Sequence, residues 1–489
     1  MSLAHSIDYI RNRYFKPSLS TDDAIQKFKS LNILPNRQKE RCQAIHAIAA
    51  ECDDKSQFFS EVAKVQLERQ ELRFAEDSAV LSIKHNPGRM PSYRVLSEVM
   101  NKAGKQSNAD ALFAYVIPDN LLQRHFSSKT VHYVKSTTAA ESKKVPIFKA
   151  QHHSANPPRQ IQHDTPEKLS ATVINEREAF TTILKNGKVW FDGSLNTVIW
   201  DKAGSVVKDL CQGYPEVIAN RSCESAPLHL NGRVFLAGNR NPHNYYHWMN
   251  DIVPMFELLN LSKIDINSID YFVLNSSNLE FQLECLQALG VKPSKIISLN
   301  NGRYFTCDEL IVSKFGNNTL GMGHGRWVAN YLKRLFNQES SENKFRKLYI
   351  SRGSTGSRSI SNEKDVIKFL KDRDFEVVYA ERLTTQQKAK LFSQANIVLG
   401  PHGAGFTSIA FCSEGAKVVE LYCDVIVPAF WNICQLHGLE HYIHKFPKPT
   451  NSRRNTLHVC LDELENLLDY VESTEKIAPN ELQQVGSAP

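Results

Sequence analysis

The chain has 489 residues, a formal net charge of +7, and hydrophobic and charged fractions of 42% and 23%. This composition is typical of a globular protein of two to four domains with a sizeable core. The positive charge would favour phosphates, diphosphates or anionic lipid surfaces. Because Lys and Arg are scattered rather than concentrated in one stripe, the sequence argues against a dedicated nucleic-acid-binding protein.

The cysteines and the apolar runs indicate the compartment. None of the ten cysteines forms a C-x-x-C pair, and several lie in strongly apolar stretches, as expected of reduced, buried thiols. The N-terminus lacks the apolar core of a secretory signal, and no stretch approaches the roughly 20 apolar residues that cross a bilayer. We therefore predict a cytoplasmic protein without a transmembrane segment; peripheral contact with the inner face of the membrane stays open.

Residues 1–126 are predicted to form an all-α module. Apolar positions recur every three or four residues, and small residues such as Ala75 and Ala79 would let paired helices approach closely. The Asn86-Pro87 step suits a turn between two helices. The pattern resembles a tetratricopeptide-type helical hairpin, and a plain helical bundle packed on the next domain is an equal alternative.

Two segments are predicted to lie outside the folded domains. Residues 127–168 lose apolar periodicity and are rich in Ser, Thr, Lys, Gln and Pro, which is typical of a linker. Residues 476–489 form a polar tail that is expected to be disordered.

The remaining chain is predicted to be α/β, with two Rossmann-like lobes at residues 169–340 and 341–475. The first begins with strands and turns, including a hairpin at Asn231-Gly232, and continues with alternating helices and strands. The second alternates more regularly and ends on a helix, which indicates a parallel sheet with crossover helices. Two such lobes would form a central cleft, and open α/β sheets bind ligands at the carboxyl ends of their strands.

The first segment with chemical potential is NYYHWMNDIVP, where His247 and Asp251 are four residues apart. On a helix they would share one face and lie within hydrogen-bonding reach. A carboxylate raises the basicity of a histidine and fixes its tautomer, so the pair could act as a general base. The alternative is a helix opening capped by Asn244, with Asp251 merely solvated.

The second segment is the turn LGPHGAGFT, which follows a buried strand and opens a helix. Glycines allow close approach of the backbone to a ligand, and a helix N-terminus favours anions, so the turn suits a diphosphate. His402 could donate a hydrogen bond to that group. The alternative is a turn whose glycines serve packing only.

Polar side chains near two further strands complete the set. Arg352 ends the strand LYI, and the loop after it carries Arg358, Asn362 and Glu363. A guanidinium matches phosphate bidentately, although an exposed loop arginine is the alternative. Glu420 ends the strand KVVE, where it could accept from ribose hydroxyls or form an ion pair. No D-x-D motif in a strand–loop context indicates a metal site, so no metal is expected to be required.

Taken in chain order, these segments resemble glycosyltransferase family 61. The resemblance covers about residues 170–445 and rests on NYYHWMNDIVP, ISR with SNE, LTTQQKAKLFSQANIVLGPHGAG, and KVVELY. It implies a GT-B fold, a nucleotide-sugar donor that is often UDP-linked, and inversion at the anomeric carbon. The helical N-terminus and the missing membrane anchor suggest a bacterial relative that builds cell-surface or capsular polysaccharide on a glycan or lipid-linked acceptor, with a protein partner possible at the helices.

The resemblance also implies roles for individual residues. His247 and Asp251 would be catalytic, with either one as the base. The predicted donor-binding residues are Arg352, Arg358, Asn362, Glu363, His402, Gly403, Ala404, Gly405 and Glu420. The predicted acceptor-side residues are Asn244, Tyr246, Trp248 and Asn250. An inactive, glycosyltransferase-like scaffold is the alternative function; a dehydrogenase is disfavoured because no G-x-G-x-x-G fingerprint follows an early strand.

Overall fold

The computed structural model divides into two compact units: a helical unit, mainly Met1–Tyr133, and a sheet unit, mainly Val134–Ser194 and Pro227–Pro489. Each unit is described by itself. The structure describes residues 19–31, 38–87, 89–113, 116–126, 131–160, 165–191, 197–213, 215, 227–238, 241–275, 278–298, 303–315, 325–336, 345–353, 358–423, 426–449 and 456–473. The predicted disordered tail, 476–489, lies outside these residues.

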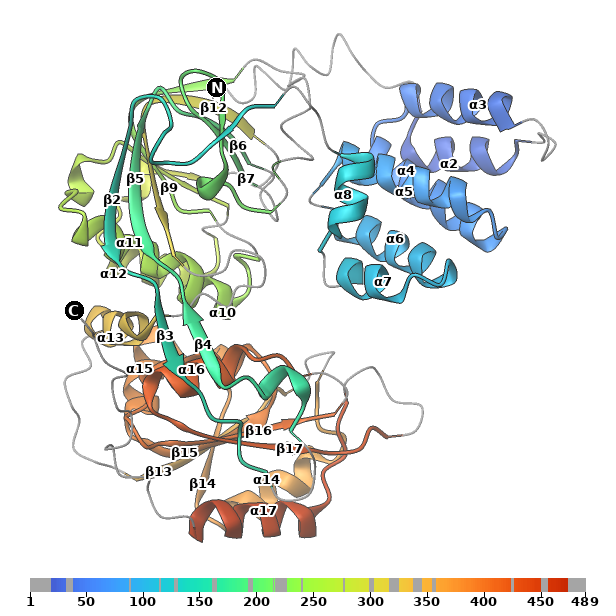
Figure 1. Ribbon diagram of the computed structural model, residues 1–489. Coiled ribbons are helices and arrows are strands. Elements are labelled where there is room, and N and C mark those ends of the chain that lie inside the picture. The colour runs from blue at the N-terminus through green and yellow to red at the C-terminus, as the bar shows by residue number, and fades with distance from the viewer. Residues whose placement is uncertain are drawn as a thin grey trace. The chain divides into compact units, whose positions relative to one another are not determined.

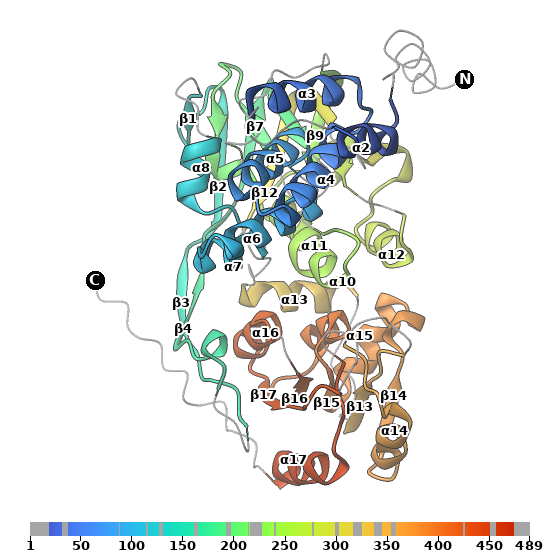
Figure 2. The ribbon, with the colours of Figure 1, turned by 90° about the vertical axis from the view of Figure 1, so that its right-hand side faces the viewer.

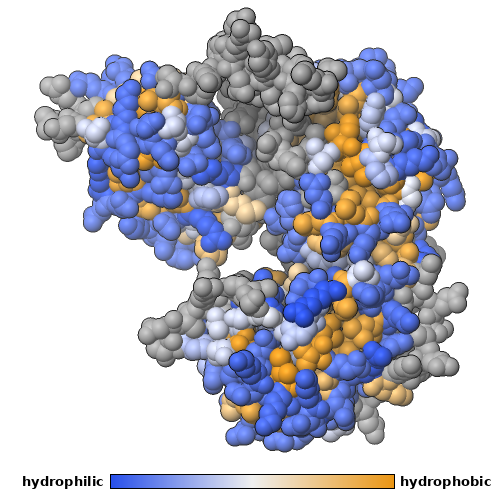
Figure 3. All heavy atoms as spheres, turned by 180° about the vertical axis from the view of Figure 1, so that it is seen from behind, coloured by the Kyte–Doolittle hydropathy of each residue, from blue (hydrophilic) through white to orange (hydrophobic). Residues whose placement is uncertain are grey.

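The helical unit contains the α-helices expected from the apolar periodicity (Figure 1). They are α2 (Thr21–Lys29), α3 (Gln38–Glu51), α4 (Lys55–Glu68), α5 (Leu72–His85), α6 (Met90–Lys102), α7 (Gln106–Phe113) and α8 (Asp119–His125). Ala75 and Ala79 are fully buried, and α5 ends at Asn86 as predicted. Figure 3 shows mostly hydrophilic residues on the visible face of this unit, as expected when amphipathic helices turn their apolar faces inward. Assignment to tetratricopeptide repeats stays a prediction.

The first sheet of the sheet unit is mixed rather than purely parallel. Its strands are β1 (Tyr133–Val134), β2 (Ser142–Phe148), β5 (Ala179–Lys185), β6 (Lys188–Phe191), β7 (Thr197–Trp200), β8 (Val206–Val207), β9 (Leu228–Leu236), β10 (Tyr271–Leu274), β11 (Ile296–Ser298) and β12 (Arg303–Lys314). Strands β12, β9, β10 and β11 run parallel, whereas β5 and β6 pair antiparallel with the two ends of β12. The predicted antiparallel strands and the predicted parallel part therefore belong to one sheet.

The hairpin predicted at Asn231-Gly232 is wrong. Residues Leu228–Leu236 form one continuous strand, and Gly232 lies at a bulge opposite Asp308, where the register with β12 shifts. Gly232 has φ +104°, and its N–H donates to the Asp308 carboxylate at 2.7 Å. The same backbone freedom that glycine supplies to a tight turn serves here to form a bulge.

The segment predicted to be a linker, 127–168, contains strands. Strand β2 pairs with β5, and β3 (Gln151–Ser154) pairs with β4 (Val173–Glu176) as a two-stranded ribbon. Beyond the ribbon, Arg159 forms a parallel bridge with Tyr442 at the edge of the second sheet. The segment therefore contributes strands to the first sheet and backbone contacts to the second, although its polar sequence indicates neither.

The second sheet is fully parallel, as predicted. Its strands are β13 (Arg346–Ile350), β14 (Phe375–Val378), β15 (Ala395–Pro401), β16 (Lys417–Tyr422) and β17 (Glu440–Lys445), and their order is β14-β13-β15-β16-β17. The chain moves outward in one direction from β13 to β14 and in the other from β15 to β17. The switch point, where open α/β sheets bind their ligands, therefore lies between the carboxyl ends of β13 and β15.

Helices cover both faces of this sheet (Figures 1 and 2). Helices α14 (Glu363–Lys371) and α17 (Leu461–Ser473) pack with Tyr349 on one face. On the other face, Leu348 and Ile350 pack with α15 (Thr385–Ser393), α16 (Ala429–His437) and the helix η7 (Ala404–Phe411). Successive side chains along β13 point to opposite faces of the sheet, so this strand packs against the helices on both faces. Sequence reasoning places a helix after Gly405; the structure shows a 3-10 helix there, beginning at Ala404.

The two sheets of the sheet unit share one core. That core joins apolar residues of α10 (Tyr245–His247), the π-helix η3 (Trp248–Ile252), α11 (Val253–Leu261) and α13 (Arg326–Leu335) with residues of α15, η7 and α16. Glu284, on α12 (Glu280–Ala288), accepts a hydrogen bond from the backbone N–H of Thr385 at 2.7 Å, at the start of α15. A carboxylate is favoured at a helix N-terminus, so this contact ties the two halves at a defined point.

Candidate active site

The switch point of the parallel sheet brings together Arg352, which follows β13, and His402 and Gly403, which follow β15. The Arg352 guanidinium donates through Nη1 to the His402 carbonyl at 3.3 Å. Gly403 leaves the room that this guanidinium occupies, because a Cβ at position 403 would collide with Nη1. Arg352 and the PHGAG turn, which the sequence analysis proposed separately as donor-binding features, therefore lie in contact.

Ala404 and Gly405, the next two residues of the turn, have different structural roles. Ala404 begins the 3-10 helix η7, whose first N–H groups lack partners within the helix itself. Gly405 packs against the Ile350 side chain, since a Cβ there would lie 2.8 Å from Cγ2. Gly405 therefore serves packing in this structure, which is the alternative that the sequence left open for the glycines.

Arg352 and Arg358 concentrate positive charge at the switch point of the parallel sheet. Burial, and then the neighbouring charge of Arg358, lower the pKa of Arg352; burial also lowers the pKa of Arg358. Among the described residues, Arg358 forms no ion pair, and its backbone adopts the left-handed φ of 60°, which is uncommon for arginine. Two half-buried guanidinium groups that repel one another provide a site that an anion such as a diphosphate would stabilise.

Glu420 forms the ion pairs that the sequence left open as the alternative to a ribose contact. It is fully buried on β16, where one carboxylate oxygen pairs with His402 Nδ1 and the other lies 3.0 Å from His441 Nε2. Burial alone would raise the pKa of this carboxyl, but the charges and hydrogen bonds of the two histidines lower it to about 2. Glu420 therefore has no exposed oxygen for a ribose, and instead holds the ring of His402.

Glu363 and Asn362 also have structural partners. Glu363 accepts from the Ser351 hydroxyl at 2.8 Å and from the Tyr349 hydroxyl at 2.9 Å, so it orients the segment that leads into Arg352. The Asn362 amide makes two hydrogen bonds to the backbone of Val459, at 2.8 and 3.0 Å. These bonds tie the start of α14 to the segment that precedes α17, and a contact between Asn362 and the donor stays a prediction.

His247 and Asp251 form the hydrogen-bonded pair that their spacing predicts. Nδ1 of His247 lies 2.7 Å from Oδ2 of Asp251, and the two side chains are 16% and 7% exposed. The carboxylate holds Nδ1, which leaves Nε2 as the ring nitrogen that remains to act on a ligand. His247 ends α10 directly before the π-helix η3, and such π-turns within helices frequently occur at functional sites.

The four predicted acceptor-side residues lie in this helix opening, and a contact between them and an acceptor stays a prediction. Asn244 is the N-cap, and its Oδ1 accepts from the N–H of Tyr246 at 2.9 Å. The Asn250 amide donates to the carbonyl of Tyr246 at 3.0 Å. Tyr246 is 6% exposed and Trp248 is fully buried, so both rings belong to the core rather than to the floor of a sugar site.

Phe430 and His441 were missed by the sequence analysis. Phe430, on α16, makes ring contacts with His402 and with Tyr246, the neighbour of His247, at centroid distances of 5.4 and 5.6 Å. This ring joins the histidine of the parallel sheet to the helix that carries the His247–Asp251 pair. Neither residue stands in a glycine-rich or strand-end motif, so no local signal distinguishes them from ordinary core positions.

Residues 245–419 match the Glycosyltransferase 61 family. The match begins two residues before His247 and includes Arg352 and the turn at His402 and Gly403, so it indicates a glycosyltransferase that acts on a sugar donor and an acceptor. A search of curated proteins found no match.

The described residues also bear on membrane insertion and on metal binding. No helix among them is long and apolar enough to cross a membrane. No group of three or more His, Cys, Asp or Glu side chains within the described ranges is arranged to hold a metal ion. Whether the reaction requires a metal stays a prediction.

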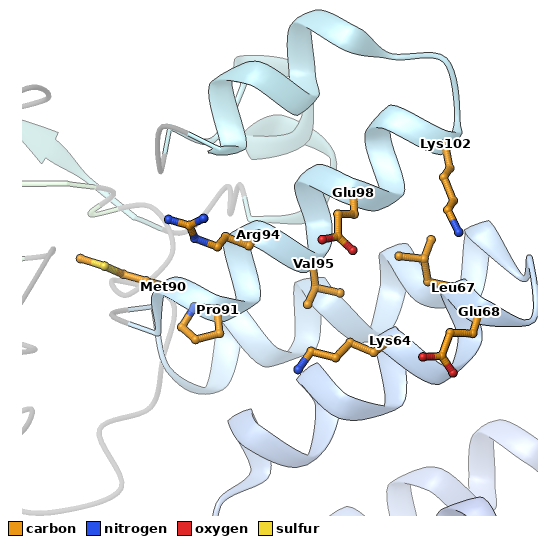
Figure 4. A pocket seen from close by; sticks show the side chains of 9 residues that line it. All are labelled: Lys64, Leu67, Glu68, Met90, Pro91, Arg94, Val95, Glu98 and Lys102. Atoms are coloured by element: carbon orange, nitrogen blue, oxygen red, sulfur yellow. The ribbon is translucent and has the colours of Figure 1, made fainter. Parts of the chain in front are cut away.

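The helical unit carries a groove of its own, between α4 and α6 (Figure 4). Its volume is about 520 Å³, and its lining combines apolar residues such as Leu67 and Val95 with charges of both signs. Lys64 and Glu68 come from α4, and Arg94 and Glu98 from α6. This mixture favours no particular ligand charge.

Proposed function

We propose that the protein is an inverting glycosyltransferase of GT-B architecture, which moves a sugar from a nucleotide-sugar donor, UDP-linked in keeping with the family resemblance, to a glycan acceptor. The observation that carries the proposal is the pairing of Arg352 with the His402-Gly403 turn at the switch point. A phosphate-sized anion at this place would meet two guanidinium groups and the N-terminus of η7.

The residues at the switch point of the parallel sheet stabilise the charge on the leaving diphosphate. As the bond between C1 of the sugar and the diphosphate oxygen breaks, negative charge develops on the leaving group. Arg352 is held at the switch point by its bond to the His402 carbonyl, and Arg358 adds a second positive charge beside it, so the two arginines would stabilise this charge. In this proposal the arginines, together with His402, take the part that a metal ion plays in other transferases, and no metal is required.

The His247–Asp251 pair supplies the general base that activates the acceptor hydroxyl. The acceptor hydroxyl oxygen attacks C1 from the face opposite to the leaving group, and its proton passes to Nε2 of His247. Asp251 holds Nδ1 at 2.7 Å and stabilises the imidazolium that forms. The alternative is that Asp251 is the base and His247 orients it. A single displacement of this kind inverts the anomeric configuration.

The setting of the reaction is also part of the proposal. The nine cysteines that the structure describes are all free thiols, and seven of them are buried, which suits a reducing compartment. We place the protein in the cytoplasm, with peripheral contact at the membrane as an option. There it would build cell-surface or capsular polysaccharide in a bacterium, on a glycan or lipid-linked acceptor, with the helical unit available to a protein partner.

A panel of nucleotides tests this function directly. UDP, GDP, TDP, CMP and NADH are titrated in turn against the full chain while the melting temperature is recorded. A ligand that binds only the folded state raises the melting temperature. A rise with one nucleoside diphosphate, or with CMP, supports the transferase and names its donor class. No rise with any nucleotide would favour the inactive scaffold instead, and a rise with NADH alone would favour a dehydrogenase.

A further inference from the structure

Three hydroxyl groups are buried where helices of the first and second sheets pack together, and none of them has a hydrogen-bond partner among the described residues. They belong to Tyr245 at the start of α10, Thr385 at the start of α15, and Ser408 in η7. A buried hydroxyl without a partner is unfavourable, because it has lost its hydrogen bonds to water without replacing them. Three such groups at one junction therefore point to a shared partner.

The ring of Tyr245 holds its hydroxyl at this junction. Phe281 of α12 meets the ring edge to face, with the two centroids 5.3 Å apart. The ammonium group of Lys388, one turn after Thr385 on α15, lies 4.1 Å from the centroid of the same ring. The backbone N–H of Thr385 is itself held by Glu284 of α12 at 2.7 Å. The Tyr245 ring and the first turn of α15 are therefore fixed against one another.

The three hydroxyls lie close together without direct hydrogen bonds between them. Burial raises the pKa of Tyr245, and the side chains of Thr385 and Ser408 act in the opposite direction, so both lie beside the phenol oxygen. None of the three oxygens is nevertheless bonded to another described residue. A buried water molecule typically makes about three hydrogen bonds to polar groups that otherwise lack partners, so one water matches this set.

A fourth buried atom without a partner, Nε1 of Trp248, extends this junction toward the catalytic helix. Burial raises the pKa of the Cys285 thiol to about 12, and the side chains of Trp248 and Thr385 oppose this rise, so the thiol lies beside both. Trp248 begins η3 and directly follows His247 in the chain. The polar atoms at the junction therefore reach from α15 to the residue next to the proposed base.

We propose that the three hydroxyls bind one buried water molecule, which ties the helix that carries His247 to the helix that follows the PHGAG turn. The water can donate to two of the hydroxyl oxygens and accept from the third. Its partners come from three helices, so it fixes α10 against α15 and η7 at a single point. Tyr245 and Ser408 are thus positioning residues. Their effect on the reaction rests on the proposed function, whereas the water site itself does not.

Substitutions that keep the side-chain shape test the water site through stability. Replacing an unpaired buried hydroxyl by an apolar group is neutral or stabilising, whereas removing a hydroxyl that binds a buried water is destabilising. Tyr245→Phe, Thr385→Val and Ser408→Ala should therefore each lower the melting temperature of the full chain by about 2 °C or more. Thr384 is the N-cap of α15, so Thr385→Val leaves the cap in place.

Thr182→Val is the matched control. Thr182 lies on β5, is fully buried, and its hydroxyl also has no partner among the described residues. This substitution should leave the melting temperature unchanged or raise it. When two substitutions at the water site are combined, their losses should not add, because the first already releases the shared water. Losses no larger than the change at Thr182, or losses that add in full, would overturn the inference.

A crystal structure of the unaltered full chain locates the water directly. Electron density for a water at about 3 Å from all three hydroxyl oxygens supports the site. Hydroxyls that bond directly to one another, with no density between them, would overturn it.

Transfer assays separate this inference from the proposed function. Tyr245→Phe and Ser408→Ala should lower kcat roughly 10-fold, because the base is displaced, and leave the affinity for UDP unchanged. Thr182→Val should keep both. A normal kcat in the two variants would overturn the positioning role. If the water is found but the unaltered protein transfers no sugar, the water site stands and the proposed function is wrong. If the protein transfers sugar and the water is absent, the proposed function stands and the inference is wrong.

Discussion

The guanidinium of Arg352 occupies the space that any side chain at position 403 would need. It lies against the backbone of Gly403 and donates to the neighbouring carbonyl of His402 at 3.3 Å. An arginine at the end of one strand and a glycine after the next strand therefore form one site.

Replacing Arg352 should weaken nucleotide binding. Hydrogen bonds to charged groups contribute about 1.5–3 kcal/mol, so Arg352→Ala should lower the affinity for the nucleoside diphosphate roughly 10- to 100-fold. Calorimetry measures the change. Arg346→Ala is the control, because Arg346 lies on the same strand but forms an ion pair with Glu376 at 3.2 Å, away from the switch point. Equal affinity in the Arg352→Ala variant and the wild type would remove this residue from the site.

Placing a methyl group at Gly403 should act through Arg352. In Gly403→Ala the new Cβ would displace the guanidinium, so the affinity should fall about as far as in Arg352→Ala, roughly 10- to 100-fold. In the double variant the two losses should not add, because both remove the same interaction. A double-mutant cycle by calorimetry measures this. Fully additive losses would show that Gly403 and Arg352 act separately.

The His247–Asp251 pair should affect the rate and not the binding of nucleotide. Loss of a general base slows a reaction about 100- to 10,000-fold, so His247→Ala and Asp251→Asn should reduce transfer by amounts in this range and leave nucleotide affinity nearly unchanged. The larger loss identifies the base. His243→Ala changes an exposed histidine four residues earlier and should keep normal transfer. Unimpaired transfer in both active-site variants would exclude the pair from the chemistry.

Glu420 should stabilise the fold in a pH-dependent way. Its pKa is lowered from 4.5 to about 2, so its ionised form contributes stability that is fully present above pH 4.5 and is lost as the pH falls toward 2. This contribution is about 3 kcal/mol at neutral pH. The difference in unfolding free energy between wild type and Glu420→Gln should therefore shrink between pH 4.5 and 2. Urea denaturation across this range measures it, and a difference that stays constant with pH would contradict this account.

Much of the second sheet could be predicted from the sequence, because each of its strands is a short apolar run followed by a helix of regular period. The same reasoning places Arg352 and the PHGAG turn at one edge of the sheet, since parallel strands bring their carboxyl ends together there, but it does not predict the contact between them. The His247–Asp251 bond follows from helical spacing alone. These features depend on local pattern and on one general rule of topology.

The features that the sequence analysis did not predict depend on burial and on contacts between residues far apart in the chain. Strand β2 reads SKKVPIF, whose charged residues hide its pairing with β5. Asn231-Gly232 suits a hairpin as well as a bulge, and only the partner strand decides between them. Glu420 resembles a ligand-binding carboxylate until His402 and His441 are seen on both of its oxygens. Trp248 resembles a sugar platform until its complete burial is known.

The proposed reaction cleaves a nucleotide sugar and inverts the anomeric carbon. The most direct measurement incubates the full chain with a panel of nucleotide sugars, detects the released nucleoside diphosphate or CMP, and records the anomeric configuration of the initial product by NMR. We predict release from one donor, a product of inverted configuration, and loss of release in the His247→Ala and Arg352→Ala variants. A product of retained configuration, or release that survives in both variants, would contradict the account.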